Sequence, residues 1–100
     1  MNDLTRYPDV ICHMTKTFDK VQNEHWNQYK KWGMQKRTLF EWLCYLTEEV
    51  GELSKAISEN EYRDGTYKDI ELEAIQVAAL ACKIVEVIQP SLMKAKEDKP

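Results

Sequence analysis

The sequence contains few of the residues that interrupt helices or build covalent frameworks. Its 100 residues include three glycines and three prolines, too few for a β-rich fold with many tight turns. Cys12, Cys44 and Cys82 form no CxxC pair, which argues against a zinc site or a disulfide framework. We expect them to be reduced, mostly buried thiols of a cytoplasmic protein. No segment approaches the roughly 20 apolar residues of a membrane span, and MNDLTRYPDV lacks the apolar region of a signal peptide.

Neither sign of charge predominates strongly, since the net charge is −3 and the pI is about 5.4. This balance gives no support for a nucleic-acid-binding surface. With 43% hydrophobic and 31% charged residues, the composition is that of a folded globular protein. The length predicts a single domain over residues 1–100, and a domain this small is expected to bury more apolar surface by forming a homodimer or homotetramer.

Apolar residues recur every three or four positions over three long segments, which predicts an all-α fold. The first helix is expected from about Pro8 to Trp32, with Gly33 as its stop and His25 as a hydrogen-bonded core residue. The second is expected at 38–59 and the third at 66–89, ending before Pro90. A short C-terminal helical segment follows, and residues 1–7 and 91–100 are expected to fray. The predicted architecture is an antiparallel helical bundle completed by oligomerisation.

Two of these helices place acidic or amide side chains on their apolar faces. On the second helix, Glu49 falls inside the apolar arc and Glu52 lies at its margin, about 60° around the helix. On the third helix, Glu73 lies within an apolar face and Gln76 lies beside it. If these helices pack antiparallel, the four side chains can converge on one point. Their oxygens suit Mg²⁺, with Mn²⁺ as the other candidate, and Mg²⁺ is usually shared with substrate phosphates.

The segments that carry these residues have a recognisable pattern. EEVGE at 48–52, followed by EAIQ at 73–76, resembles the EExxE…ExxD pattern of MazG-like nucleoside triphosphate pyrophosphohydrolases. KWGMQ at 31–35 and QVAALA at 76–81 are also similar to segments of some short members, so the resemblance spans about residues 26–88. It implies an all-α enzyme that uses Mg²⁺ to hydrolyse an NTP or dNTP to the monophosphate and pyrophosphate by attack of an activated water.

The resemblance also implies roles for individual residues. Glu49, Glu52 and Glu73 would bind the metal, and Gln76 stands where the family pattern has Asp. Glu48 would be a further ligand or would orient the attacking water, so the candidate catalytic residues are Glu48 and Glu49. The candidate substrate-binding residues are cations for the phosphates and one aromatic ring for the base: Lys55, Lys83, Lys36 and Trp32.

Other interpretations of the same helices remain open. Gln76 removes one negative charge from the expected site, which would suit a non-catalytic helical adaptor that kept the bundle and lost the chemistry. A di-metal redox bundle is disfavoured, because the second and third helices contain no histidine for Glu-x-x-His pairs.

Overall fold

The chain is described by a computed structural model that covers residues 7–97, with side chains described for residues 13–95. It contains three helices: α1 (Tyr7–Trp32), α2 (Leu39–Tyr62) and α3 (Tyr67–Glu97). Within residues 7–97 there is no β-strand, so the predicted all-α class is confirmed.

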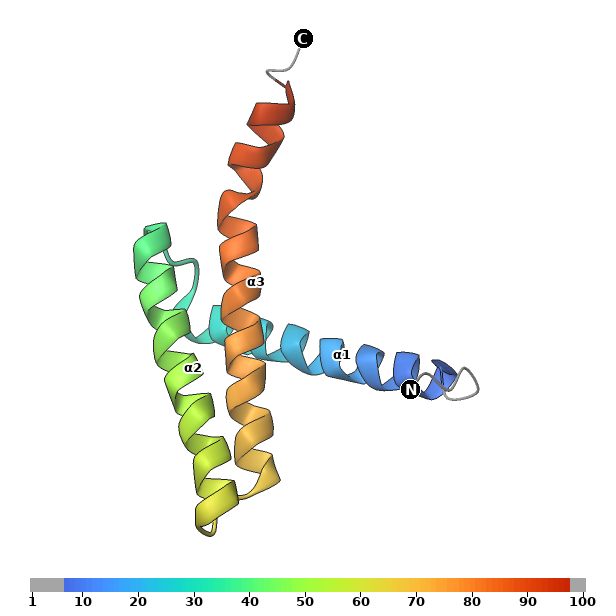
Figure 1. Cartoon of the computed structure of the whole chain (residues 1–100). Helices are drawn as coiled ribbons and strands as arrows, with labels where there is room; N and C mark the ends of the chain where they lie inside the picture. The colour runs from blue at the N-terminus through green and yellow to red at the C-terminus, as the bar shows by residue number, and fades with distance from the viewer. Residues whose placement is uncertain (1–6, 98–100) are drawn as a thin grey trace.

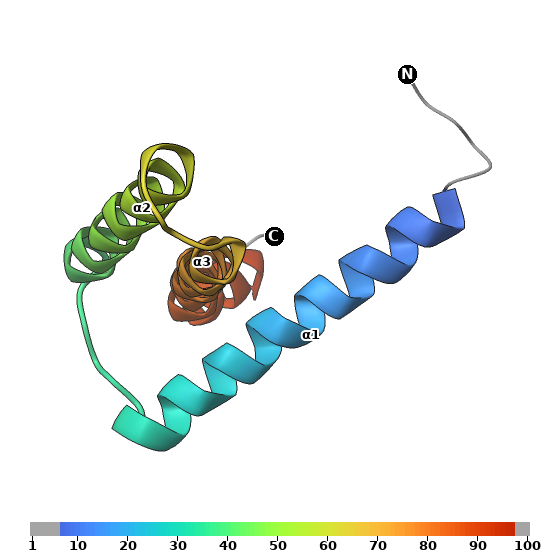
Figure 2. The ribbon, with the colours of Figure 1, turned by 90° about the horizontal axis from the view of Figure 1, so that it is seen from below.

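Helix α3 lies between the other two helices and contacts both (Figures 1 and 2). Helices α2 and α3 run antiparallel, side by side, as a hairpin. Helix α1 lies on the other side of α3 and crosses it instead of running along it. The helices therefore form an antiparallel hairpin of α2 and α3 with α1 across α3, in place of the expected bundle of three antiparallel helices.

The ends of α1 and α2 follow from local signals that the sequence displays. Gly33 adopts a φ of +68°, a left-handed conformation that costs glycine little, and its N–H donates to the Tyr29 carbonyl at 2.7 Å. Thr38 and Glu41 form a capping box, in which each side chain accepts a hydrogen bond from the other residue's backbone N–H. These bonds also lower the pKa of the Glu41 carboxyl group. The predicted stop and start are confirmed.

The turn between α2 and α3 depends on Gly65. A Cβ atom at this position would lie 2.8 Å from the backbone of Glu59 and Asn60, so no other residue fits without moving the chain. The Gly65 carbonyl accepts a 3.0 Å bond from the Asn60 side chain, which closes the turn further. Thr66 then caps α3 by accepting a hydrogen bond from the Asp69 N–H at 3.2 Å, as the sequence predicted.

The predicted end of α3 was wrong. The helix does not stop before Pro90 but continues through it to Glu97, so residues 91–97 belong to α3 and are not a separate helical segment. Pro90 removes one backbone donor, whose partner would be the carbonyl four residues earlier. The residues that follow, LMKAKE at 92–97, are good helix formers and continue the helix beyond the proline.

The buried core is small. Its apolar members among the described side chains are Trp42, Ala56, Ala79 and Leu80, all between α2 and α3 or beside them. The expectation of mostly buried thiols was wrong for Cys44 and Cys82, which are exposed on faces that no other helix covers; the Cys12 side chain lies outside the described residues. None of the three helices, within residues 7–97, has a stretch long and apolar enough to span a membrane.

Polar side chains hold α1 across α3. The Lys20 ammonium lies 2.8 Å from Glu71, and His25 Nε2 lies 2.9 Å from Glu86. The His25 side chain is 26% exposed and its Nδ1 has no hydrogen-bond partner, so His25 contacts α3 through Glu86 and is not the core residue that was expected. Lys20, together with Lys68 at 2.9 Å, lowers the pKa of Glu71 to about 2. The apolar face predicted for α1 is less covered than expected, since Met14 and Phe18 are exposed.

Candidate functional site

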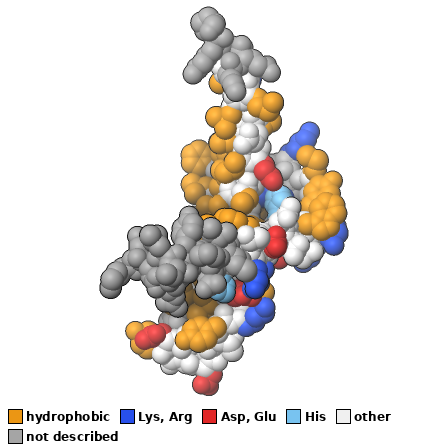
Figure 3. Space-filling view, turned by 90° about the vertical axis from the view of Figure 1, so that its right-hand side faces the viewer, with side chains coloured by type: hydrophobic (Ala, Val, Ile, Leu, Met, Phe, Trp, Pro, Cys, Tyr) orange, Lys and Arg blue, Asp and Glu red, His pale blue; other side chains and the backbone are white. Residues whose placement is uncertain are grey.

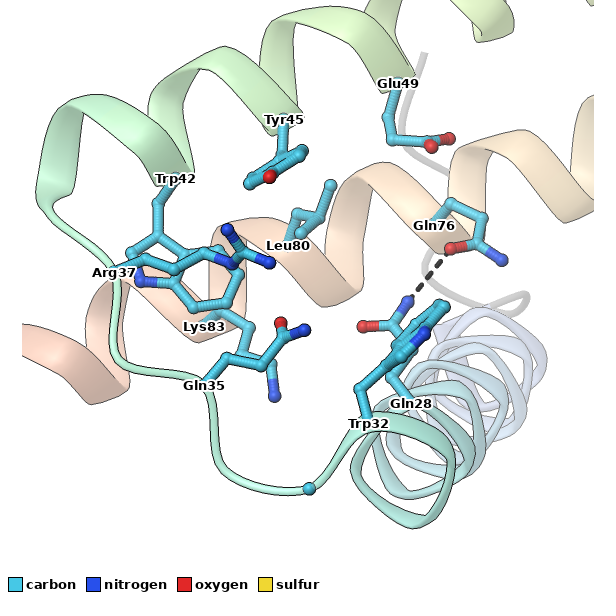
Figure 4. A pocket seen from close by; sticks show the side chains of 11 residues that line it. Gln28, Trp32, Gln35, Arg37, Trp42, Tyr45, Glu49, Gln76, Leu80 and Lys83 are labelled. Carbon is cyan, nitrogen blue, oxygen red and sulfur yellow. Dashed lines mark hydrogen bonds between the residues drawn. The ribbon is translucent and has the colours of Figure 1, made fainter.

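A pocket of about 310 Å³ opens where α1, the 33–38 loop, α2 and α3 meet (Figure 4). Its lining combines three aromatic rings, three amide side chains, two cations and one carboxylate. The lining residues are Gln28, Trp32, Gly33, Gln35, Arg37, Trp42, Tyr45, Glu49, Gln76, Leu80 and Lys83. This mixture of apolar walls with a few charged groups is typical of a small-molecule site.

The carboxyl groups of Glu49 and Glu73 approach each other across the α2–α3 interface, closely enough for Glu73 to raise the pKa of Glu49. Burial raises this pKa most, and the neighbouring Glu73 carboxyl group raises it further. The charges of Glu73, Glu52 and Glu48 act in the same direction, because like charges oppose joint ionisation. The antiparallel packing thus brings together the two glutamates that the sequence placed on apolar helix faces.

The other two glutamates of the EEVGE segment lie farther out. Glu48 and Glu52 are exposed and do not line the pocket, although their charges act on Glu49. Among the side chains of residues 13–95, no three His, Cys, Asp or Glu groups meet closely enough to form a preformed metal cluster. Two adjoining carboxylates still fit Mg²⁺, which commonly takes one or two protein carboxylates and completes its shell with water and phosphate.

Gln76 lines the pocket next to Glu49, but its oxygen already has a partner. Gln28 Nε2 donates to Gln76 Oε1 at 2.9 Å and also to Glu24 Oε2 at 3.0 Å. Gln28 is only 8% exposed and lies on α1 at the crossing with α3. Gln28 is a pocket residue that the helical pattern of the sequence did not predict.

Two cations face the pocket from different elements. The Arg37 guanidinium stacks over the Tyr45 ring at 4.7 Å, and its only ion pair among the described side chains is a long 3.9 Å contact with Glu41. Its Nε atom is buried without a hydrogen-bond partner. The Lys83 ammonium lies 5.9 Å from the centre of the Trp42 ring. Both groups retain donors for an anionic ligand.

We compared the chain with models of protein families, with curated proteins and with solved structures. None of the three comparisons gave a significant match.

The structure separates the predicted substrate-binding residues into two groups. Lys83 and Trp32 line the pocket. Lys36 and Lys55 are exposed and lie outside its lining. In the 33–38 loop it is Arg37, the neighbour of Lys36, that lines the pocket.

The spacing of Gln28 and Trp32 in the sequence does contain a sign that Gln28 lies beside the pocket wall. Gln28 lies four residues before Trp32, so both side chains occupy the same face of a helix. That pairing indicates a polar group beside an aromatic wall, but it does not reveal that this face would meet α3.

Proposed function

We propose that this protein is a Mg²⁺-dependent nucleoside triphosphate pyrophosphohydrolase, converting an NTP or dNTP to the monophosphate and pyrophosphate. The observation that supports the proposal most directly is the meeting of Glu49 and Glu73 beside a pocket that also contains Arg37 and Lys83. A triphosphate with its metal needs both signs of charge, with carboxylates for the cation and basic groups for the phosphate oxygens.

The carboxylates would hold the metal. Glu49 and Glu73 would bind Mg²⁺ directly, with Glu52 at the edge of the site, and the bound ion would neutralise phosphate charge and acidify a water. Gln76 Oε1 accepts a hydrogen bond from Gln28, so Gln76 would orient its neighbours or contribute its remaining lone pair. Glu48 is exposed beside Glu49 and would accept the proton of the attacking water.

The remaining pocket residues would bind the nucleotide. Arg37 and Lys83 would donate to phosphate oxygens, because both face the pocket, and the one carboxylate paired with either of them among the described side chains is Glu41, 3.9 Å from Arg37. Trp32 would stack on the base; the Lys31 ammonium lies 4.7 Å from the centre of its ring, which leaves the opposite face for a ligand. Lys36 and Lys55 would contribute charge from outside the pocket.

The test is pyrophosphate release from a panel of NTPs and dNTPs, with Mg²⁺ and with EDTA. We expect release that requires Mg²⁺, is lost in Glu49→Gln, and is retained in Glu61→Gln, which neutralises an exposed carboxylate at the far end of α2. No release from any nucleotide, with Mn²⁺ also tried, would refute the enzyme proposal. The chain would then be better described as the non-catalytic helical adaptor.

We also propose that the protein works as a homo-oligomer, with a homodimer as its smallest unit. On α2, Leu43, Val50 and Ile57 recur every seven residues, and they are 49%, 47% and 50% exposed. A seven-residue apolar repeat of this kind is the pattern by which helices pair. Along the upper half of α3, hydrophobic side chains also reach the surface (Figure 3). Val85, Leu92 and Met93 of this helix are all more than half exposed.

A charge placed in this α2 stripe should disrupt the oligomer. We expect the wild type to sediment as a dimer or tetramer at micromolar concentration and Val50→Lys to sediment as a monomer. Ser58→Lys adds the same charge to an exposed position on the same helix, and it should not change the mass. A monomeric wild type in sedimentation equilibrium would contradict the proposal.

A further inference from the structure

Gln28 contributes a buried amide where α1 crosses α3. Gln28 is only 8% exposed, and it lines the pocket. Buried amides normally form hydrogen bonds through both their N–H donors and their oxygen acceptor. An amide oxygen or nitrogen without a partner in the protein is therefore available to a ligand.

Glu24 determines which way the Gln28 amide points. A carboxylate only accepts hydrogen bonds, so the Gln28 nitrogen, and not its oxygen, must face Glu24 Oε2 at 3.0 Å. The same nitrogen donates to Gln76 Oε1 at 2.9 Å. Both N–H groups of Gln28 are therefore used, and its oxygen accepts no hydrogen bond from any described side chain or backbone group.

The Gln28 oxygen is directed into the pocket. Figure 4 shows Oε1 on the side of the amide that faces the space between Gln28 and Gln35, away from the bond to Gln76. Trp32 lies one helical turn further along α1 and forms the adjoining wall. A planar ring stacked on Trp32 would thus bring its edge toward an acceptor whose orientation is locked.

We infer that Gln28 determines base specificity: its Oε1 accepts a hydrogen bond from an exocyclic amino group of a base stacked on Trp32. The inference rests on the proposed function, because it takes the pocket to be a nucleotide site. It predicts that bases with an amino group, cytosine and adenine, bind better than uracil and hypoxanthine, in which a carbonyl oxygen replaces that group.

The locked orientation makes this discrimination possible. A free glutamine can turn its amide over and present a donor to a carbonyl or an acceptor to an amine. Gln28 cannot do so without placing its oxygen against the Glu24 carboxylate. A base carbonyl facing Gln28 would leave two acceptors opposed and unsatisfied, a loss worth about tenfold or more in affinity.

The experiment compares bases that differ only at this group. Binding of CMP against UMP, and of AMP against IMP, is measured by calorimetry with the full chain. We expect about a tenfold preference for the amino member of each pair, reduced to near equality in Gln28→Leu. Gln22→Leu changes an exposed glutamine of the same helix and should keep the preference. The ratio within a pair cancels any general loss of affinity that the Gln28 variant causes.

The outcomes separate this inference from the proposed function. Equal binding within both pairs, or a preference for the carbonyl member, would overturn the role of Gln28 even if pyrophosphate release is observed. A preference that survives in Gln28→Leu would overturn it too. Because monophosphate binding requires no hydrolysis, loss of the pyrophosphohydrolase activity alone would refute the reaction and leave the specificity result standing.

Discussion

Glu49→Gln is expected to stabilise the protein in EDTA by roughly 2–4 °C in melting temperature, and to abolish its response to Mg²⁺. At neutral pH the wild type must ionise Glu49 against burial and against the charge of Glu73, which raise its pKa. A neutral amide of the same shape removes that cost. The wild type should instead gain about 10 °C when Mg²⁺ reaches a hundredfold excess over its Kd, because ligands that bind the folded state stabilise it.

The pH dependence has a definite sign. Because the pKa of Glu49 is raised in the folded protein, its contribution to stability is complete in acid and is lost as pH rises through that pKa. The advantage of Glu49→Gln in EDTA should therefore disappear below about pH 4, where the glutamate is protonated in either state. Thermal melts by circular dichroism measure both effects, with Glu61→Gln as the control. A Mg²⁺-dependent rise in Glu49→Gln equal to that of the wild type would show that the ion binds elsewhere.

Trp42→Ala is expected to have the largest effect on stability, a loss of about 3–5 kcal/mol in the free energy of unfolding. Trp42 is 3% exposed and is the largest side chain in a small core. It packs between α2 and α3 and contacts Tyr45 edge-on. Since small domains have only about 5–15 kcal/mol in total, most of the stability would be lost.

Trp26 offers a matched control for this substitution. It is 56% exposed on α1, stacked on Tyr29 at 5.5 Å, and Trp26→Ala should cost about 1 kcal/mol or less. Urea denaturation at one fixed protein concentration compares the two variants. If Trp42→Ala lowered the free energy of unfolding by less than about 1 kcal/mol, as an ordinary surface substitution does, Trp42 would not be a core residue between α2 and α3.

The parts of the fold that depend on neighbouring residues were predicted from the sequence. The capping box at Thr38 and the stop at Gly33 use contacts within four residues, so the local pattern contains the necessary information. Helical periodicity also located Glu49 and Glu73 on apolar faces, and an antiparallel hairpin is sufficient to bring them together.

Other features depend on how the helices meet, which periodicity does not specify. The crossing of α1 over α3 places Gln28 against Gln76, and a pattern within α1 alone does not contain that contact. In the 33–38 loop, adjacent cations point in different directions, so the choice of Arg37 over Lys36 required the structure. The helix continues through Pro90 because the residues after it are good helix formers, and this outweighs the loss of one backbone donor.

The crowded turn at Gly65 has a consequence for how this chain could vary in length. The Gly65 turn fixes where α3 begins, so one residue inserted into the first turn of α3 would rotate the rest of the helix by about 100° and advance it by about 1.5 Å. Leu72 would then take the position that Glu73 occupies, and Glu49 would lose its partner although neither glutamate had changed. In a chain that keeps these two carboxylates together, insertions should be found in the 33–38 loop or beyond α3, while the number of residues from the Gly65 turn to Glu73 stays constant.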